Sequence, residues 1–304
     1  MAHGHVHSHA QLPKRRDFGR NFAIATALNV ALVIAQVIYG FLANSLALLA
    51  DAGHNFGDVI GLVLAWGAFA LSGWKPSRGY TFRFQGASIL AAFANGLILV
   101  VATGAIAWEA VRRFWEPQEV ATGTVMALAL LGVVVNGISA LFLHAGRKSD
   151  LNVQGAFVHM VADAGMSLAV LAAAAGIYFT GWQWLDPVAG LAIAAVILGG
   201  TWSLLRESFR LSLNAAPSAI DPAAVQHFLE SRAEVRSVHD LHIWAMSTTA
   251  TAMSCHIVTT GHPGNAFLHD VAHELEHRFN ISHPTIQIEL ADAGRCPVEH
   301  DHAA

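Results

Sequence analysis

Charged residues are scarce in this chain of 304 residues: Asp, Glu, Lys and Arg together make up 12%. Soluble domains contain about 25% of these residues, so the composition excludes an ordinary soluble globular protein. There are only two cysteines, Cys255 and Cys296, which excludes a fold held together by a disulfide framework. The net charge of −4 provides no basic surface of the kind that nucleic-acid binding requires. Of the whole chain, 54% is hydrophobic, which indicates an integral membrane protein in a lipid bilayer.

Six long apolar stretches occupy the first two thirds of the chain, and each is close to the roughly 20 residues that a membrane-spanning helix needs. They cover residues 21–43, 46–72, 86–111, 121–145, 154–180 and 185–210. We therefore expect a mainly α membrane protein with a six-helix transmembrane bundle over residues 21–212. The part before it, residues 1–20, contains alternating histidines and is expected to be a His-rich cytoplasmic tail.

The basic residues between the stretches indicate the orientation, because cytoplasmic loops are rich in Lys and Arg. One set of loops contains only Arg112 and Arg113. The opposite set contains Lys14, Arg15, Arg16, Arg20, Lys75, Arg78, Arg83, Arg147, Lys148, Arg206 and Arg210. This asymmetry and the even number of spans place both termini in the cytoplasm. For location, we expect the inner (cytoplasmic) membrane of a bacterium.

After Pro217 the pattern changes to that of a small soluble domain. Helices are predicted at 223–233 and 266–279, and strands at 235–247, 251–260 and 285–290. The order α-β-β-α-β suggests an α+β ferredoxin-like cytoplasmic domain over residues 213–291. Residues 292–304 are expected to form a flexible tail.

The second and fifth stretches contain ionisable residues that a simple membrane anchor does not need. His54 and Asp58 are four positions apart in one stretch, and His159 and Asp163 have the same spacing in the other. An i,i+4 spacing places each pair on one helix face. A carboxylate at bilayer depth costs about 2.5–3.5 kcal/mol, so each needs a partner. Two imidazoles and two carboxylates together predict a tetrahedral site for a borderline metal such as Zn²⁺.

A third acid, Asp51, lies one turn before His54 on the same face. Three roles remain open for it: a transient metal ligand, a proton relay, or a cap on the outer side. Among the amides of the spans, Gln36 could support the metal-binding helices or hydrogen-bond between helices.

The sequences LLADAGHNFGD and DLNVQGAFVHMVAD resemble the cation diffusion facilitator family, in its zinc-exporting branch. The resemblance extends over nearly the whole chain. It implies a homodimeric secondary active transporter, and no enzyme, that exports Zn²⁺ from the cytosol in exchange for protons, with Cd²⁺ and Co²⁺ as further candidate substrates. Alternating access would then operate around His54, Asp58, His159 and Asp163.

The resemblance also implies a second, regulatory Zn²⁺ site in the C-terminal domain, at the dimer interface. The matching residues are His239 and His256, with His242 and Glu289 as weaker candidates. Where relatives have His and Asp in the last strand, this chain has Gln287 and Glu289, and a glutamine amide is a poor Zn²⁺ ligand. A further family site in the loop SGWKPSRGYTFRFQ is expected to be absent, because that loop has no histidine and no acid.

Other functions remain as alternatives. A membrane-anchored metal sensor would not transport, and a passive channel would carry metal regardless of a pH gradient. His273 and His277 form a literal His-Glu-x-x-His motif, with His283 at the third ligand position of a zinc peptidase. The domain of about 80 residues is too small for a peptidase cleft, and the methionine turn of such enzymes is missing.

Overall fold

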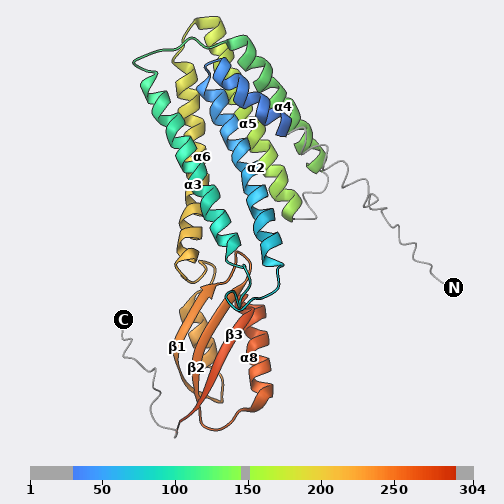
Figure 1. The fold of residues 1–304 in the computed structure, drawn as a ribbon, viewed down its shortest axis with the longest axis vertical. Helices are drawn as coiled ribbons and strands as arrows, with labels where there is room; N and C mark the ends of the chain where they lie inside the picture. Colours follow the sequence, from blue (N-terminus) through green and yellow to red (C-terminus); the bar gives the residue numbers. More distant parts are fainter. Residues whose placement is uncertain (1–29, 145–150, 292–304) are drawn as a thin grey trace, which may run out of the picture. The chain divides into compact units, whose positions relative to one another are not determined.

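The computed structural model describes residues 30–144 and 151–291, and within the latter it leaves the side chains of residues 151–153 and 156 undescribed. It is mostly helical, with a small α+β domain at the C-terminal end (Figure 1). The expected tails, 1–20 and 292–304, lie outside the described residues.

Within the described part of the chain, five helices are long and apolar enough to cross a membrane. They are α2 (Leu46–Ser72), α3 (Ala87–Arg112), α4 (Thr122–His144), α5 (Leu151–Thr180) and α6 (Leu185–Ser212). Each agrees within three residues at either end with an expected stretch, which confirms five of the six predicted spans. The first expected span, 21–43, begins outside the described residues. Its described part is a shorter apolar helix, Val30–Leu42, so this span is not confirmed.

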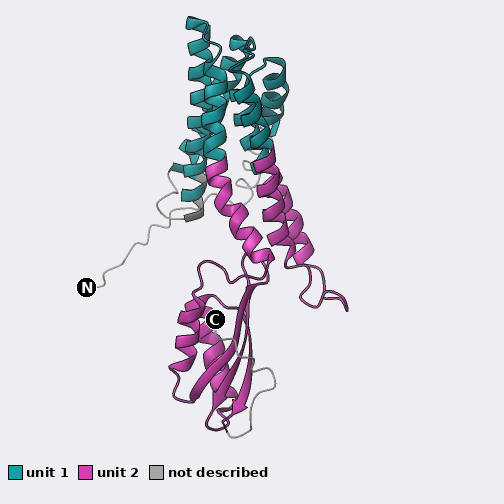
Figure 2. Ribbon diagram, turned by 90° about the vertical axis from the view of Figure 1, so that its left-hand side faces the viewer, with its two compact units in different colours: residues 1–59, 102–197 teal, residues 60–101, 198–304 magenta. Residues whose placement is uncertain are grey.

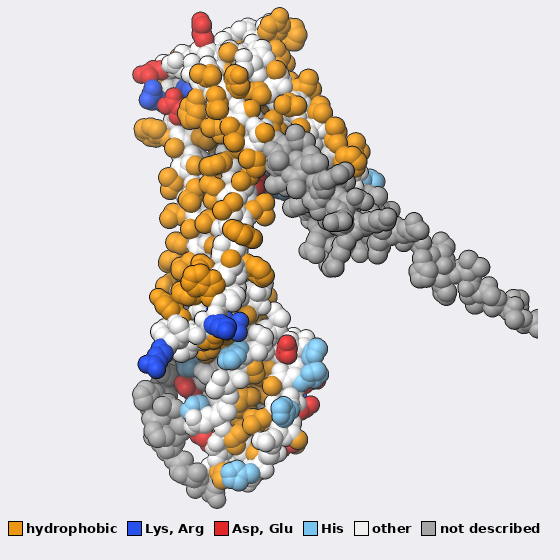
Figure 3. Space-filling view, turned by 45° about the vertical axis from the view of Figure 1, so that its right-hand side comes forward, with side chains coloured by type: hydrophobic (Ala, Val, Ile, Leu, Met, Phe, Trp, Pro, Cys, Tyr) orange, Lys and Arg blue, Asp and Glu red, His pale blue; other side chains and the backbone are white. Residues whose placement is uncertain are grey.

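The spans expose large apolar side chains, and Figure 3 shows hydrophobic groups covering the surface of the helices on one face. Phe142 of α4 and Phe179 of α5 are each 81% exposed. In water such a surface would be unstable, whereas acyl chains solvate it without penalty. The exposed apolar surface therefore agrees with an integral membrane protein.

The chain divides into two compact units, coloured separately in Figure 2. The first contains residues 1–59 and 102–197, and the second contains residues 60–101 and 198–304. In the first unit, α4 and α5 pack side by side. Its buried apolar core draws small residues from α2, α4 and α5, such as Ala47, Ala129 and Ala174, which allow the helix backbones to approach closely.

The second unit contains the α+β domain, formed by α7 (Pro222–Glu230), β1 (Val235–Ala245), β2 (Thr251–Thr259), α8 (Gly264–Phe279) and β3 (His283–Leu290). This confirms the predicted α-β-β-α-β order. The three strands form one sheet in the order β1-β2-β3, in which β2 pairs antiparallel with β1 and parallel with β3. Both helices contribute to the domain core, which includes Leu229 of α7, Met253 and Ile257 of β2, and Leu275 of α8.

Local capping explains where α7 begins and where α8 ends. Asp221 caps α7 by accepting a hydrogen bond from the backbone N–H of Ala223 at 3.0 Å, and Pro222 occupies the first turn. Asn280 ends α8 in the left-handed conformation (φ 57°), which asparagine tolerates better than most residues.

A bulge interrupts the pairing of β1 with β2. His239 pairs with His256 and His242 pairs with Ser254, so β1 contains one additional residue in this interval. Asp240 lies there with a φ of 51°. The bulge changes the direction of the side chains in β1.

Candidate metal centre

Helices α2 and α5 place their two His-x-x-x-Asp pairs against one another, within the first unit. Nε2 of His54 lies 3.3 Å from Oδ1 of Asp163 and 3.7 Å from Oδ2 of Asp58. Nε2 of His159 lies 3.4 Å from Oδ2 of Asp58 and 3.6 Å from Oδ2 of Asp163. Each imidazole thus faces both carboxylates, although the two helices are about a hundred positions apart in the sequence.

The four side chains, which we call the quartet, supply two nitrogen and two oxygen donors. Three of them, His54, His159 and Asp163, place ligand atoms within 4.8 Å of one another, close enough to share one ion. Two imidazoles and two carboxylates match the ligand types and number of a tetrahedral Zn²⁺ site.

The solvent exposure of the four side chains decreases from one side of the quartet to the other. The side chains of His159 and Asp58 are 41% and 35% exposed, that of His54 is 20% exposed, and that of Asp163 is 1% exposed. His159 and Asp58 lie one helical turn beyond Asp163 and His54, respectively, so the quartet opens on one side and is closed on the other.

The closed side continues into a buried polar layer one turn further along both helices. Oδ2 of Asp51 accepts hydrogen bonds from Nε2 of Gln36 and from Oγ of Ser167, each at 3.0 Å. All three residues are fully buried. On α4, Gly132 leaves room for this layer, because a Cβ atom there would come within 2.7 Å of the Ser167 hydroxyl.

The structure places Asp51, for which the sequence left three roles open, inside α2 and against two other helices. Its carboxylate joins α2 to the helix Val30–Leu42 and to α5. Gln36, whose role the sequence also left open, makes an interhelical hydrogen bond to this acid.

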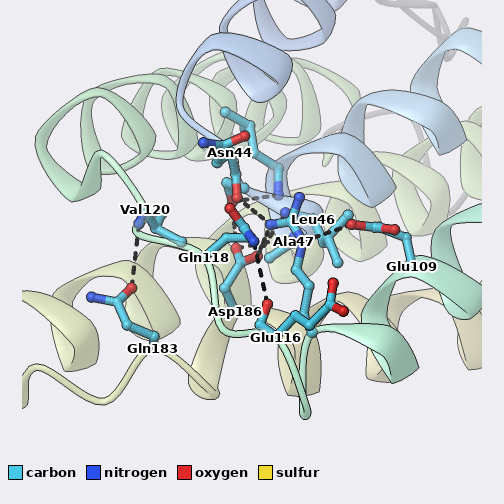
Figure 4. A network of polar contacts seen from close by, with 12 residues as sticks. Asn44, Leu46, Ala47, Glu109, Glu116, Gln118, Val120, Gln183 and Asp186 are labelled. Carbon is cyan, nitrogen blue, oxygen red and sulfur yellow. Dashed lines mark hydrogen bonds and ion pairs between the residues drawn. The ribbon is translucent and has the colours of Figure 1, made fainter.

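The N-terminus of α2 is capped by Asp186, at the start of α6 (Figure 4). Its carboxylate accepts hydrogen bonds from Ser45 Oγ at 2.5 Å, from the backbone N–H of Leu46 at 2.7 Å and from that of Ala47 at 3.3 Å. Nη1 of Arg113 lies 3.7 Å from the same carboxylate.

Further polar contacts around this cap connect neighbouring segments of the chain. Arg113 donates to the carbonyl oxygen of Asn44, and its Nε lies 3.3 Å from Oε1 of Glu109. Gln183 accepts a hydrogen bond from the backbone of Val120. An anionic group at a helix N-terminus is favourable because the first N–H groups have no partners within the helix. The network therefore fixes the end of the helix from which His54 and Asp58 project.

A second cluster lies in the α+β domain, on the strands. Glu289 of β3 reaches both histidines: its Oε1 lies 2.8 Å from Nδ1 of His256, and its Oε2 lies 3.5 Å from Nε2 of His239. The two imidazole rings are 5.2 Å apart. These three residues form a second group able to share an ion.

Two further residues adjoin this cluster. Gln287 does not take the place of a ligand but donates a hydrogen bond to Oε1 of Glu289 at 3.0 Å. The bulge residue Asp240 places Oδ2 3.8 Å from Nε2 of His256 and Oδ1 2.9 Å from Nε2 of His242.

The His-x-x-x-His pair of α8 is arranged differently. His273 and His277 are exposed, with their rings 4.2 Å apart, while Leu275 between them is buried in the domain core. His283, the position of a third peptidase ligand, begins β3 and packs edge-on against Phe82. Among the described residues, these three histidines do not form a group able to share an ion.

Sequence reasoning missed Ser167, Asp186 and Asp240. A signal existed for Ser167, which follows Asp163 by one helical turn and so shares its face. Asp186 could have been noticed as an acid in the first turn of a span. Asp240 gave no signal, because a bulge depends on the pairing of two strands.

Comparison with known proteins identifies the family of this chain. Residues 22–211 match the family model described as "Cation efflux transmembrane domain", and residues 217–291 match "Cation efflux protein, cytoplasmic domain". The chain is 36% identical to the "Cadmium, cobalt and zinc/H(+)-K(+) antiporter" of Bacillus velezensis over 95% of its own length and 92% of that protein.

Two further relatives are similar over comparable lengths. "Zinc transporter ZitB" of Escherichia coli is 36% identical over 95% of this chain and 93% of its own length. "Metal cation efflux system protein CzcD" of Cupriavidus metallidurans is 35% identical over 96% and 91%, respectively. The matched families and these relatives are transporters and not enzymes, which argues against the peptidase alternative.

Proposed function

This chain belongs to the cation efflux family, the cation diffusion facilitators, and from that premise we propose that it exports Zn²⁺ from the cytosol in exchange for protons. Cd²⁺ and Co²⁺ are further candidate substrates, because the Irving–Williams order separates these ions only weakly on nitrogen and oxygen ligands. Relatives named for zinc, cadmium and cobalt transport support the range of ions.

One observation carries the proposal: both imidazoles of the quartet face both carboxylates, at 3.3–3.7 Å. Ionisable groups inside a membrane span are costly unless they pair with one another or serve a transported ion. A Zn²⁺ ion drawn toward these four side chains would satisfy all of them at once. We therefore assign His54, Asp58, His159 and Asp163 as the transport site.

Competition at this site is sufficient to couple the two transported species. Metal binding needs neutral imidazole and ionised carboxylate, so Zn²⁺ and protons exclude one another. Free imidazole titrates at about pH 6.5, which lies within the physiological range of pH, so a pH difference across the membrane can change its charge. Zn²⁺ loads from the cytosol, the helices expose the quartet to the other side, and protons then displace the metal and are carried back.

The remaining parts of the chain are assigned as follows. Residues 21–212 form the transmembrane domain, and residues 213–291 form a ferredoxin-like domain for metal binding and dimerisation. Both termini and this domain lie in the cytoplasm of a bacterial cell, and two copies of the chain form a homodimer. The loop cations and the match to the family's cytoplasmic domain support this arrangement.

The strand cluster fits a regulatory Zn²⁺ ion. His239, His256 and Glu289 offer two imidazoles and one carboxylate, and Nε2 of His239 is buried without a hydrogen-bond partner among the described residues. His256 and Glu289 would complete the set, with Asp240 as a fourth donor across the bulge. Metal bound here would stabilise the dimer and favour the transport-competent state.

The proposal is tested with purified protein in liposomes that carry a pH gradient and a zinc-sensitive dye in the lumen. Wild-type protein should move Zn²⁺ in the direction opposite to protons. His54→Ala and Asp163→Ala should abolish this flux while the dimer stays folded. His277→Ala, in the exposed pair of α8, is the matched control and should leave the flux unchanged.

The outcomes separate the alternatives. Flux that persists in His54→Ala or Asp163→Ala removes these residues from the transport site. Flux in the wild type that ignores the pH gradient indicates a passive channel. Absence of flux in the wild type, together with Zn²⁺ binding, indicates the membrane-anchored sensor.

A further inference from the structure

We propose that Asp51 is a proton-binding site distinct from the quartet, and that its carboxyl group is protonated in this conformation and releases its proton when a divalent cation arrives. This inference rests on the proposed function, since it assigns one of the exchanged protons to a named atom. Asp51 is three residues before His54, and its hydrogen bonds are with Gln36 and Ser167 and not with a member of the quartet.

The first argument is the lack of a cation. Asp51 is 0% exposed, and among the described residues no Lys, Arg or His nitrogen lies within 4.0 Å of its carboxylate. A carboxylate buried without a counter-ion is strongly disfavoured, and it takes up a proton instead. Asp186 shows the opposite case in the same unit: three donors and the guanidinium of Arg113 surround its buried carboxylate.

The second argument is the position of the hydrogen bonds. Both donors, Gln36 Nε2 and Ser167 Oγ, use the same atom, Oδ2 of Asp51. Two acceptors at this contact have no hydrogen-bond partner among the described residues: Oδ1 of Asp51 and Oε1 of Gln36. A proton on Oδ1 supplies the missing donor. A carboxylic acid and an amide then pair in both directions, N–H to Oδ2 and O–H to Oε1, which satisfies both side chains.

The third argument concerns the neighbouring charges. The helix Val30–Leu42 has no charged residue, and α4 has only His144 at its far end. On α2 and α5 the nearest ionisable groups are His54 and Asp163, each one turn from this layer. The carboxylate of Asp163 disfavours a second anion nearby, whereas a divalent cation at the quartet favours one. Arrival of the metal therefore promotes ionisation: the O–H bond of Asp51 breaks, Oδ1 keeps the electron pair, and the proton passes to water.

The protonation state is tested by infrared difference spectroscopy of the full-length protein in detergent. Wild type minus Asp51→Asn should show the carbonyl stretch of a protonated carboxyl group, shifted in D₂O. Wild type minus Asp221→Asn, the control at an exposed helix cap, should show only carboxylate bands. Asparagine can donate to Gln36 and accept from Ser167, so Asp51→Asn should fold. If it does not, Ser167→Ala removes a donor to Oδ2 and should shift the same band.

The exchange is tested by counting the protons released when Zn²⁺ alone is added to the protein at a fixed pH. Wild-type protein should release up to about one proton more per bound Zn²⁺ than Asp51→Asn, while both bind the metal. Equal release, or the absence of a protonated carboxyl band that depends on Asp51 or Ser167, overturns this inference even if transport is intact. Absence of Zn²⁺ flux in wild-type liposomes overturns the proposed function instead.

Discussion

Nε2 of His54 lies 3.3 Å from Oδ1 of Asp163, across the contact between α2 and α5. In the reciprocal contact, Nε2 of His159 on α5 lies 3.4 Å from Oδ2 of Asp58 on α2, so each helix supplies both ligand types to one site. Replacing one imidazole with a carboxylate keeps the site but changes its chemistry.

We expect His54→Asp to lower the preference for Zn²⁺ over Mn²⁺, because imidazole suits Zn²⁺ whereas carboxylate oxygens suit Mn²⁺. Competition between the two ions for uptake into liposomes measures the change. His273→Asp, on the exposed face of α8, is the control and should leave the preference as in the wild type. A preference unchanged in His54→Asp would contradict the assignment of this imidazole as a ligand.

A second prediction concerns the cap of α2. Asp186→Ala leaves the N–H groups of Leu46 and Ala47 and the guanidinium of Arg113 without their buried acceptor. Breaking a buried charge pair costs about 3–5 kcal/mol, so thermal unfolding in detergent should occur at a clearly lower temperature.

The control for Asp186→Ala is a substitution in an exposed ion pair next to Arg113. Glu116 lies 3.5 Å from Arg112, and both side chains are largely exposed. Glu116→Gln should change the stability by less than about 1 kcal/mol, because solvent screens such pairs. Equal effects of the two substitutions would show that the Asp186 network does not stabilise the helix end.

The structure brings the four side chains of the quartet together, and this proximity could be expected from the sequence because the spacing within each pair is local. An i,i+4 pair shares a helix face in any α-helix, and the high cost of a charge in lipid required the two pairs to meet. The boundaries of α2–α6 could be predicted from the sequence as well, since apolar length alone defines a span. The Asp186 cap could not be predicted, because it joins residues about 140 positions apart and depends on how α6 packs beside α2.

The strand cluster was predicted only in part for a similar reason. The family resemblance, and not the spacing, pointed to His239, His256 and Glu289, which lie one on each of the three strands. Gln287 raised doubt as a poor ligand, but its amide supports Glu289 instead. Asp240 reaches the cluster only because the bulge adds one residue to β1.

A third prediction tests the strand cluster. In a chain whose transport site is disabled by Asp163→Asn, Glu289→Gln should weaken Zn²⁺ binding to the cytoplasmic domain by at least about tenfold, since the amide is a poor ligand. Calorimetric titration of the full-length protein measures the affinity. Glu230→Gln, an exposed acid that accepts from Gln226 on α7, should have no effect. Similar affinities in all three proteins would exclude Glu289 as a ligand.

A fourth prediction concerns Gly132. Alanine there would place Cβ 2.7 Å from the Ser167 hydroxyl, which donates to Asp51, so the polar layer must shift. Overpacking of this kind costs about 1–3 kcal/mol, measurable as a lower unfolding temperature. Gly137→Ala on the same helix meets no atom within 4 Å and should be neutral or slightly stabilising. Adding Ser167→Gly to Gly132→Ala should restore most of the stability. If it does not, the loss of stability in Gly132→Ala does not come from a clash with the Ser167 side chain.

The last prediction uses the buried thiol of β2. Burial raises the pKa of the Cys255 thiol to about 12, above its value in an unfolded chain. Below the pKa of the thiol in the unfolded chain, the neutral thiol contributes fully to the free energy of unfolding. This contribution is lost as the pH rises toward 12, because only the thiol of the unfolded state then ionises freely. In a Cys296→Ser background, maleimide should label Cys255 slowly at pH 8 and rapidly after unfolding, and stability should fall above about pH 9. Cys255→Ala should remove this thiol-dependent part of the alkaline loss, whereas rapid labelling of the folded protein would show that the thiol is accessible and its pKa ordinary.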